Sequence, residues 1–178
     1  MAAAVLVIDV QRGLCEGGGA SWDGDAVIAR INEVTHKARA AEVPVFFIQH
    51  EEPAGGLLVH GTPAWELAKG LHAEAGDQYL RKTATDSFHR TELQARLAPY
   101  GATELVICGM HSEFCVDTTT RRALALGFPV QLVADGHTTA DKPHLGAAQI
   151  IAHHNATLAN ISSFGPRARP VAAAALHF

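Results

Sequence analysis

Cysteine is scarce in this sequence, and the few cysteines form no recognisable pair. Cys15, Cys108 and Cys115 are the three among 178 residues, and no C-x-x-C spacing occurs. This excludes a disulfide framework and a zinc-ribbon site, which both need spaced cysteine pairs. Eleven histidines are present, but none lies in an H-E-x-x-H spacing, so a zinc-protease helix is excluded as well. We expect the chain to work in a reduced compartment.

Positive charge and long apolar runs are also lacking. The formal net charge is -4, so no basic surface for a nucleic-acid backbone is expected. No apolar run approaches the roughly 18 residues that a membrane-spanning helix needs. The N-terminal segment MAAAVLVIDVQ lacks the basic region and cleavage site of a signal peptide. These absences predict a cytoplasmic protein that binds neither nucleic acid nor membranes.

Short apolar runs alternate with helical patterns along the chain. The clearest helical pattern places Val27, Ile31, Val34, Ala38 and Ala41 on one face, as expected for a helix with one buried stripe. Strands that are apolar throughout and alternate with helices favour a parallel sheet covered on both faces. We therefore predict a three-layer α/β/α fold. The predicted strands are Val5–Ile8, Val45–Ile48, Tyr79–Leu80, Leu105–Cys108, Val130–Val133 and Thr157–Ile161.

The length of the chain fits a single domain, which we place at residues 1–164 with a C-terminal tail at 165–178. The tail is either a frayed end or a segment packed on a partner subunit, and its composition does not decide between them. The segment from Gln49 to Gly76 interrupts the alternation with several prolines and glycines. Loops of this length usually carry function, so we expect this one to wall or cover a pocket.

Reactive side chains follow three of the predicted strands. Asp9 comes after the first strand, Lys82 after the third, and the loop after the fourth leads to Cys115. Ligands of open parallel sheets bind beyond the carboxyl ends of the strands, so these groups are expected to face one crevice. Each has a simpler interpretation. Asp9 could cap a loop or serve a phosphatase-type site, although Gln11 replaces the second carboxylate of such a site, and Lys82 could be a solvated charge.

Cys115 is predicted to lie in the first turn of a helix. In the stretch LVICGMHSEFCVDTTTRRALALG the strand pattern stops at Gly109, and Ser112 has the character of a helix N-cap. Unpaired N–H groups and the positive end of the helix dipole would favour the thiolate there. The alternative is that Cys115 is a small apolar residue packed between a helix and the sheet.

Four segments together resemble the isochorismatase-like family of cysteine hydrolases, which includes nicotinamidases and carbamoylsarcosine amidases. They are VLVIDVQ, KTATDSFHRTEL, LVICGMHSEFCVDTTTRRALALGF and VQLVADGHTT, and the resemblance spans residues 5 to about 158. It implies a six-stranded, mainly parallel sheet in the Rossmann-like order 3-2-1-4-5-6. It also implies a catalytic triad, carried here by Asp9, Lys82 and Cys115.

The resemblance further implies a non-proline cis peptide between Met110 and His111. Nicotinamidases of the family carry an Asp-x-His metal cluster after the second strand, but Gln49 stands in place of the Asp here and the spacing to His60 is wrong. We therefore expect no metal and no cofactor. Relatives that hydrolyse the vinyl ether of isochorismate lack the nucleophilic cysteine, so Cys115 argues against that reaction.

These observations predict a hydrolase that cleaves a carbon–nitrogen bond of a small-molecule amide through a thioester. Cys115 would attack the carbonyl, Asp9 would carry protons, and Lys82 would orient Asp9. The backbone N–H groups of His111 and Cys115 are expected to form the oxyanion hole. That expectation fails if the Ser112 hydroxyl captures the N–H of Cys115 as its cap.

Substrate specificity is expected to come from side chains over the crevice, and a homo-oligomer is expected because relatives commonly assemble. The candidate pocket residues are His50, Trp65, His89, His111 and Phe114.

Three other functions stay open at this point. The protein could be an isochorismatase-type ether hydrolase in which Cys115 is a bystander, or a catalytically silent α/β module that binds a small molecule. It could also be a redox sensor, for which Cys15 is the one conceivable resolving cysteine. Cys15 is otherwise interpreted as buried filler, and Cys108 as a core residue.

Overall fold

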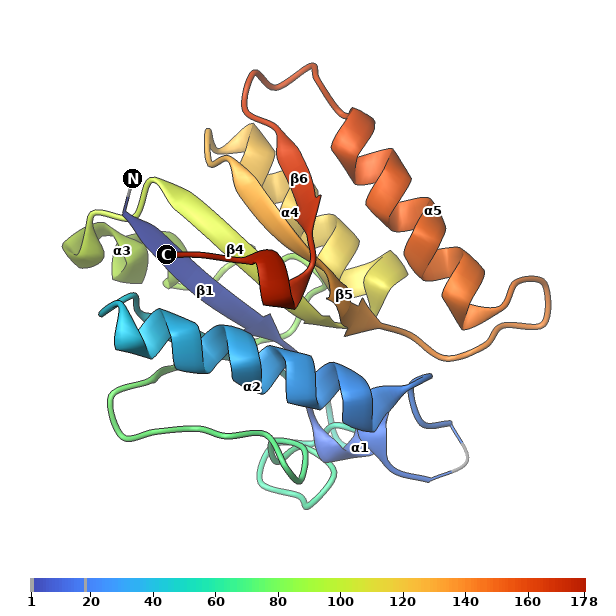
Figure 1. Ribbon diagram of the computed structural model, residues 1–178. Coiled ribbons are helices and arrows are strands. Elements are labelled where there is room, and N and C mark those ends of the chain that lie inside the picture. The colour runs from blue at the N-terminus through green and yellow to red at the C-terminus, as the bar shows by residue number, and fades with distance from the viewer. Residues whose placement is uncertain (1, 18) are drawn as a thin grey trace.

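Strands and helices alternate along the chain in the computed structural model, which describes residues 2–17 and 19–178 (Figure 1). The strands are β1 (Ala3–Ile8), β2 (Val45–His50), β3 (Gln78–Lys82), β4 (Glu104–Met110), β5 (Val130–Thr138) and β6 (Ala168–Val171). The α-helices are α1 (Arg12–Cys15), α2 (Gly24–Ala40), α3 (Leu93–Leu97), α4 (Asp117–Ala125) and α5 (Ala147–Asn160). Shorter turns are η1 (Ala98–Tyr100), η2 (Ser112–Val116) and η3 (Ala173–Ala175). Within the described residues, no helix has the length and apolar character needed to cross a membrane.

The strands form one parallel sheet in the order β3-β2-β1-β4-β5-β6, which confirms the predicted fold and strand order. The chain runs outward from β1 on one side and from β4 on the other, so the order reverses between these two strands. Ile8 of β1 pairs with Gly109 of β4, and His50 of β2 pairs with Lys82 of β3. The carboxyl ends of four strands therefore meet at one edge, where ligands of such sheets bind.

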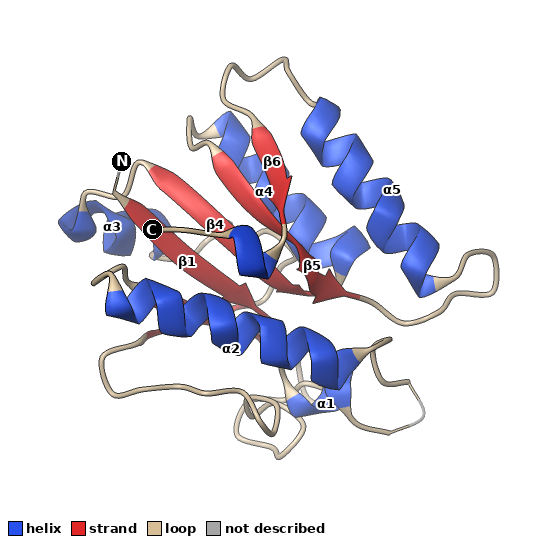
Figure 2. Cartoon of the chain, viewed as in Figure 1, coloured by secondary structure: helices blue, strands red, loops and turns tan. Residues whose placement is uncertain are grey.

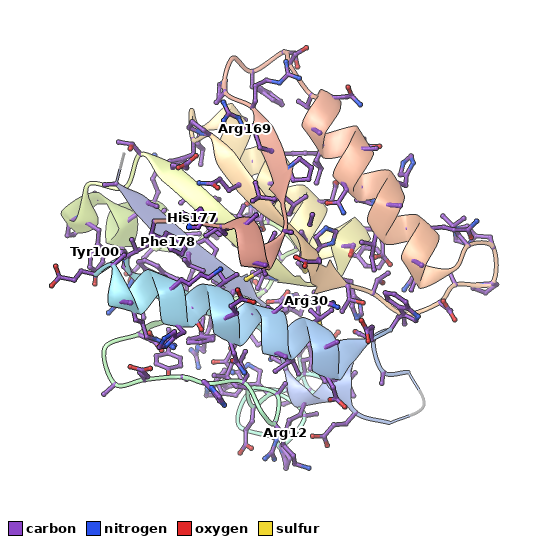
Figure 3. The ribbon with its side chains drawn as sticks, in the orientation of Figure 1. Arg12, Arg30, Tyr100, Arg169, His177 and Phe178 are labelled. Carbon is purple, nitrogen blue, oxygen red and sulfur yellow. The ribbon has the colours of Figure 1, made fainter. Side chains whose placement is uncertain are left out.

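Helices cover both faces of the sheet (Figure 2). α2 packs on one face against alternate residues of β1 that include Val5 and Val7. α3, α4 and the end of α5 pack on the other face, toward which Leu6 points. The chain ends on the α2 side, where His177 and Phe178 lie (Figure 3). Because successive side chains of a strand point to opposite faces, each central strand contributes to both core layers.

The sixth strand lies elsewhere than the sequence predicted. Residues 157–160 belong to α5, and β6 is formed by Ala168–Val171, which pairs with β5. The prediction was wrong because Leu158 is buried from a helix, and a short apolar run does not distinguish a helix end from a strand. The segment 165–178 is thus not a frayed end, since it contains the edge strand of the sheet.

Gly109 allows the ends of β1 and β4 to approach each other. Its φ is 121°, and a Cβ atom placed there would lie 2.0 Å from the carbonyl oxygen of Ile8. We expect Gly109→Ala to destabilise the fold by about 3 kcal/mol or more, because the clash and the unfavourable φ act together. The matched control is Gly101→Ala, at a φ of 61° with open space around it, which should cost about 1 kcal/mol. Urea unfolding measures both, and equal losses would contradict the close-approach argument.

Candidate functional site

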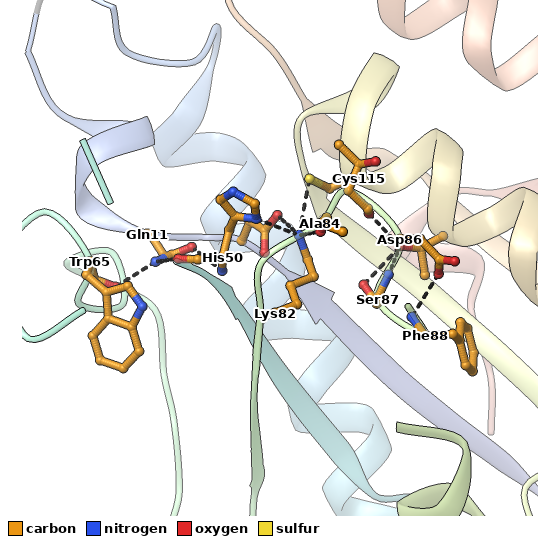
Figure 4. A network of polar contacts seen from close by, with 12 residues as sticks. Gln11, His50, Trp65, Lys82, Ala84, Asp86, Ser87, Phe88 and Cys115 are labelled. Atoms are coloured by element: carbon orange, nitrogen blue, oxygen red, sulfur yellow. Dashed lines mark hydrogen bonds and ion pairs between the residues drawn. The ribbon is translucent and has the colours of Figure 1, made fainter. Parts of the chain in front are cut away.

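The amine of Lys82 lies between a carboxylate and a thiol at the carboxyl edge of the sheet. Its Nζ is 2.6 Å from Oδ2 of Asp9 and 3.2 Å from Sγ of Cys115. Figure 4 shows Lys82 reaching from the end of β3 toward Cys115. All three residues are buried, with 1% of Asp9, 2% of Lys82 and 8% of Cys115 exposed. The structure therefore brings together the three residues that the sequence placed at separate strand ends.

Two further groups lie close to the ammonium group of Lys82. Besides Asp9 and Cys115, it lies 3.1 Å from the carbonyl oxygen of Ala84 and 3.4 Å from Nδ1 of His50. A lysine has three N–H donors, which match the three acceptors Asp9, Cys115 and Ala84. Oδ1 of Asp9 is buried and has no hydrogen-bond partner among the described residues. The site thus offers a carboxylate oxygen that is free to accept a proton.

Backbone contacts and a buried glutamine hold Asp9 at the end of β1. Asp9 has a left-handed φ of 52°, and its N–H donates to the carbonyl of Ile48 at 2.8 Å. Nε2 of Gln11 donates to the carbonyls of His50 and Trp65, and its Oε1 accepts from the N–H of His50. Gln11 therefore ties β1 to β2 and to the long loop. No sequence pattern signalled this role, because it depends on contacts between residues far apart in the chain.

Cys115 lies in the π-helical turn η2, which leads directly into α4. The peptide bond between Met110 and His111, just before this turn, is cis. The carbonyl oxygen of His111 accepts hydrogen bonds from the N–H groups of Phe114 and Val116, at 3.1 Å and 3.2 Å. The residues on both sides of Cys115 are thus held to the same carbonyl group.

The start of this turn differs from the prediction. The N-cap position is occupied by His111, and no side chain of the described residues caps the turn, so the assignment of Ser112 as N-cap was wrong. The reason is that the Ser112 hydroxyl lies 2.7 Å from Nδ1 of the buried His137 and is engaged there. It therefore does not act as the cap that would have taken the N–H of Cys115.

Burial raises the pKa of the Cys115 thiol to about 12, and the negative charge of Asp9 adds to this effect. The positive charge of Lys82 lowers the pKa but does not outweigh them. This direction runs against the expectation of a thiolate in the resting site, because the sulfur lies out of water beside a carboxylate. A thiol that keeps its proton needs a base to become a nucleophile, and Asp9 is the adjacent carboxylate.

A cavity of about 870 Å³ opens beside these residues along β3. Of the three converging residues Lys82 alone borders it, since neither Asp9 nor Cys115 is among its lining residues. Trp65 comes from the long loop after β2, so the prediction that this loop walls a pocket is confirmed. The lining residues are Gln49, Glu51, Trp65, Tyr79, Leu80, Arg81, Lys82, Thr83, Arg90, Thr91, Glu92 and Arg96.

The predicted pocket residues lie at different places around this edge. His50 is half-buried against Lys82, and burial together with that positive charge lowers its pKa and so favours the neutral ring. The ring of His111 is half-buried, with Nε2 3.2 Å from the hydroxyl of Ser21. Phe114 is 48% exposed. His89 is exposed, and no hydrogen bond within the described chain joins its side chain to Lys82 or its partners.

The two other cysteines lie in apolar surroundings. Cys108 is fully buried in β4, which confirms it as a core residue, and burial raises its pKa to about 12. Cys15 is half-buried, with Sγ 3.6 Å from Sδ of Met110. Burial and nearby acidic groups raise its pKa to about 11. All three cysteines are free thiols.

The region that would hold a metal cluster does not fit a metal. Gln49 stands in place of the aspartate, and its Nε2 donates to the carbonyl of Trp65. His60 lies 2.8 Å from the guanidinium of Arg81, so its ring already has a cationic neighbour. In the part of the chain that the structure describes, no group of three or more His, Cys, Asp or Glu residues is placed to hold a metal ion.

The chain is similar to several known proteins over most of its length. It is 38% identical over 140 residues to a streptothricin hydrolase from Streptomyces noursei, which covers 79% of this chain and 56% of that protein. It is 30% identical over 160 residues to the secreted isochorismatase effector Isc1 from Verticillium dahliae. This match covers 89% of this chain and 84% of that protein. Nicotinamidase 3 from Arabidopsis thaliana is 26% identical over 174 residues. This match covers 90% of this chain and 80% of that protein. The chain spans about half the length of the two streptothricin hydrolases that it matches, 56% and 51%.

The fold and a family match agree with these similarities. A crystal structure of an isochorismatase family protein superposes with a TM-score of 0.87 at 34% identity, covering 96% of this chain and 98% of that one. The Isochorismatase domain matches residues 3–163. The chain therefore belongs to the isochorismatase family.

Proposed function

We propose that the protein is a hydrolase that cleaves the carbon–nitrogen bond of a small amide through a thioester on Cys115. The observation that carries this proposal is the buried ammonium of Lys82, which lies within hydrogen-bonding distance of both Asp9 and Cys115. Similarity to proteins named streptothricin hydrolase and nicotinamidase supports the same class of reaction.

In the first half of the reaction, Asp9 moves the thiol proton to the leaving group. Its free Oδ1 takes the proton of Cys115 as the sulfur bonds to the carbonyl carbon, which gives a tetrahedral oxyanion. The carboxylic acid then returns this proton to the nitrogen, the carbon–nitrogen bond breaks, and the amine leaves a thioester behind. Because the thiol pKa is about 12, proton removal and attack are expected to occur together.

In the second half, water releases the acid. Asp9 takes one proton from water as the oxygen bonds to the thioester carbonyl carbon. The carbon–sulfur bond then breaks, and Asp9 returns the proton to sulfur. The second proton of the water stays with the carboxylic acid product, so the thiol and the carboxylate are both regenerated.

Lys82 supplies a fixed positive charge in both halves. Its ammonium holds Oδ2 of Asp9, which leaves Oδ1 for the proton, and it lowers the pKa of Cys115 as the sulfur loses its proton. Its side chain is fully buried, so water screens this charge little. The positive charge of Lys82 therefore stabilises the site most when the negative charge has moved from Asp9 to the sulfur of Cys115.

The backbone N–H groups of His111 and Cys115 are the proposed donors to the oxyanion. The Ser112 hydroxyl is engaged with His137, so it does not compete for the N–H of Cys115 as a cap would. One such donor typically contributes about 3 kcal/mol to the stability of the transition state.

The test is to incubate the protein with a panel of primary amides, ureas and lactams and to look for ammonia or amine release and for an acyl adduct by intact mass. Cys115→Ala should abolish both signals, whereas Cys15→Ala should keep them. An adduct that persists in Cys115→Ala would contradict the mechanism. A vinyl ether is assayed beside the panel. Its hydrolysis by Cys115→Ala would favour the ether hydrolase, and a wild type inert toward every compound would favour a binding module.

A further inference from the structure

A chain of hydrogen bonds runs from α5 to the turn that carries Cys115. Oγ of Ser112 is 2.7 Å from Nδ1 of His137, and Nε2 of His137 is 3.1 Å from Oδ1 of Asn155. Nδ2 of Asn155 in turn donates to the carbonyl of Ala134 at 2.9 Å. Ser112 and His137 are almost completely buried, and Asn155 is half-buried. Side chains from η2, β5 and α5 are therefore linked in one series.

The carbonyl of Ala134, at the end of the series, determines the direction of each hydrogen bond. A backbone carbonyl can only accept, so the amide nitrogen of Asn155 faces Ala134 and its oxygen faces His137. His137 must then donate from Nε2 and accept at Nδ1, which makes the Ser112 hydroxyl the donor. Burial lowers the pKa of His137, in agreement with the neutral ring that this arrangement needs. The hydroxyl of Ser112 therefore has one defined orientation.

We propose that the series Ser112–His137–Asn155 positions Cys115 for attack, with His137 as its central positioning residue. This inference rests on the proposed function, since it requires Cys115 to be the nucleophile. Ser112 is the first residue of η2 and Cys115 is the fourth, so the anchor at Ser112 fixes where the turn begins and where the sulfur points. Displacing a reacting group by about 1 Å can slow catalysis about a hundredfold.

Glu113 anchors the same turn through contacts outside this series. Oε1 of Glu113 accepts the hydroxyl of Thr139 at 2.8 Å and lies 3.0 Å from Nζ of Lys142. Neither contact involves His137. Variants of the series are therefore expected to fold with a displaced sulfur rather than to lose the turn.

The experiment measures kcat and KM for the amide that the wild type hydrolyses fastest among benzamide, methylurea and 2-piperidone. Ser112→Ala and His137→Leu should each lower kcat by about ten- to a hundredfold, with KM little changed, because they misplace the nucleophile without altering the pocket. His137→Asn keeps an acceptor close to the position of Nδ1 and should retain most of kcat. The double variant Ser112→Ala/His137→Leu should be no slower than His137→Leu, because the two residues act as one unit.

Thr35→Ala is the matched control. It removes another buried hydroxyl, which lies in α2 and is 3.2 Å from the carbonyl oxygen of Asn32. We expect it to lower the melting temperature about as much as Ser112→Ala does, while leaving kcat unchanged. A loss of kcat in both variants would reduce the role of Ser112 to general stability and would overturn the inference.

The outcomes separate this inference from the function on which it rests. Wild-type kcat in Ser112→Ala and His137→Leu, in a protein whose turnover requires Cys115, overturns the positioning role alone. Losses that multiply in the double variant overturn it too, because they assign the two residues independent effects. The absence of any Cys115-dependent turnover in the wild type overturns both. If His137→Leu does not fold, Ser112→Ala and His137→Asn decide the question.

Discussion

Replacing Asp9 by Asn is expected to stop amide hydrolysis and, at the same time, to make Cys115 easier to alkylate. Turnover loses its proton carrier, so kcat should fall by about 10²- to 10⁴-fold. Alkylation should change in the opposite direction, because Asp9 raises the pKa of Cys115 whereas Lys82 lowers it. With the carboxylate gone, the ammonium faces the sulfur alone and the thiol pKa falls. Iodoacetamide, which reacts with the thiolate, should then modify Cys115 about tenfold faster at pH 8.

Slower hydrolysis combined with faster alkylation distinguishes a chemical role of Asp9 from a structural one. A variant that merely disturbs the edge of the sheet would change both rates in ways unrelated to charge. Asp23→Asn is the control, because Asp23 has the same left-handed φ of 52° but a partly exposed side chain paired with Arg30. It should leave both rates unchanged. Hydrolysis that survives in Asp9→Asn, or alkylation of Cys115 that becomes slower, would contradict the proposed proton transfer.

The pH dependence of alkylation follows from the same charges. Because the thiol pKa of the wild type is about 12, the thiolate fraction of Cys115 should keep rising with pH up to that value, without a plateau near pH 9. In Asp9→Asn the plateau should move to lower pH. Peptide mass spectrometry is needed to follow Cys115 separately, since Cys15 and Cys108 are also free thiols.

The fold could be predicted from the sequence because its signals are local. Apolar runs such as Val5–Ile8 and the stripe on α2 each reflect the face or faces that an element buries. Both lie where expected except for Ala41, which is exposed at the C-cap of α2. The failure at β6 has a physical cause. Ala168–Val171 is a short edge strand containing Pro170, so it lacks the continuous apolar run that marks a central strand.

The neighbourhood of the site could be predicted for a different reason. In a parallel sheet, residues that follow the strands must gather at one edge, so Asp9, Lys82 and Cys115 could be placed together without any distance information. The protonation state of Cys115 could not be predicted from the sequence. It depends on how completely atoms from several segments remove water from the sulfur, and the sequence does not contain that quantity.

The hydrogen-bonded series behind Cys115 was also beyond sequence reasoning. Ser112, with its hydroxyl just before a helical pattern, had the signature of a cap, and a cap needs only local geometry. The competing partner His137 lies 25 positions away, at the end of β5, and its own partner Asn155 lies on α5. Local sequence patterns do not predict a contact between residues so far apart. Here the contact with His137 determined the orientation of the Ser112 hydroxyl.

Lys82→Met is expected to abolish turnover and also to destabilise the protein. The ammonium is the charge that balances the buried carboxylate of Asp9, and removing one partner of a buried ion pair typically costs about 3 to 5 kcal/mol. Loss of the positive charge also raises the pKa of Cys115 further, so alkylation should become slower, opposite to the effect of Asp9→Asn. Urea unfolding and alkylation rates measure the two effects separately. Lys69→Met, which removes an exposed lysine, should change the free energy of unfolding by no more than about 0.5 kcal/mol.

The double variant Asp9→Asn/Lys82→Met separates the charge of Lys82 from its packing. It leaves no uncompensated charge in the interior, so it should recover much of the stability that Lys82→Met loses, while it stays inactive. If the double variant were no more stable than Lys82→Met, the loss of stability in Lys82→Met would come from packing of the lysine side chain. The broken ion pair would then not be its cause. Stability that returns without activity would mean that the fold tolerates a neutral interior at this edge. The buried charges would then be retained for the chemistry of Cys115 rather than for the stability of the sheet.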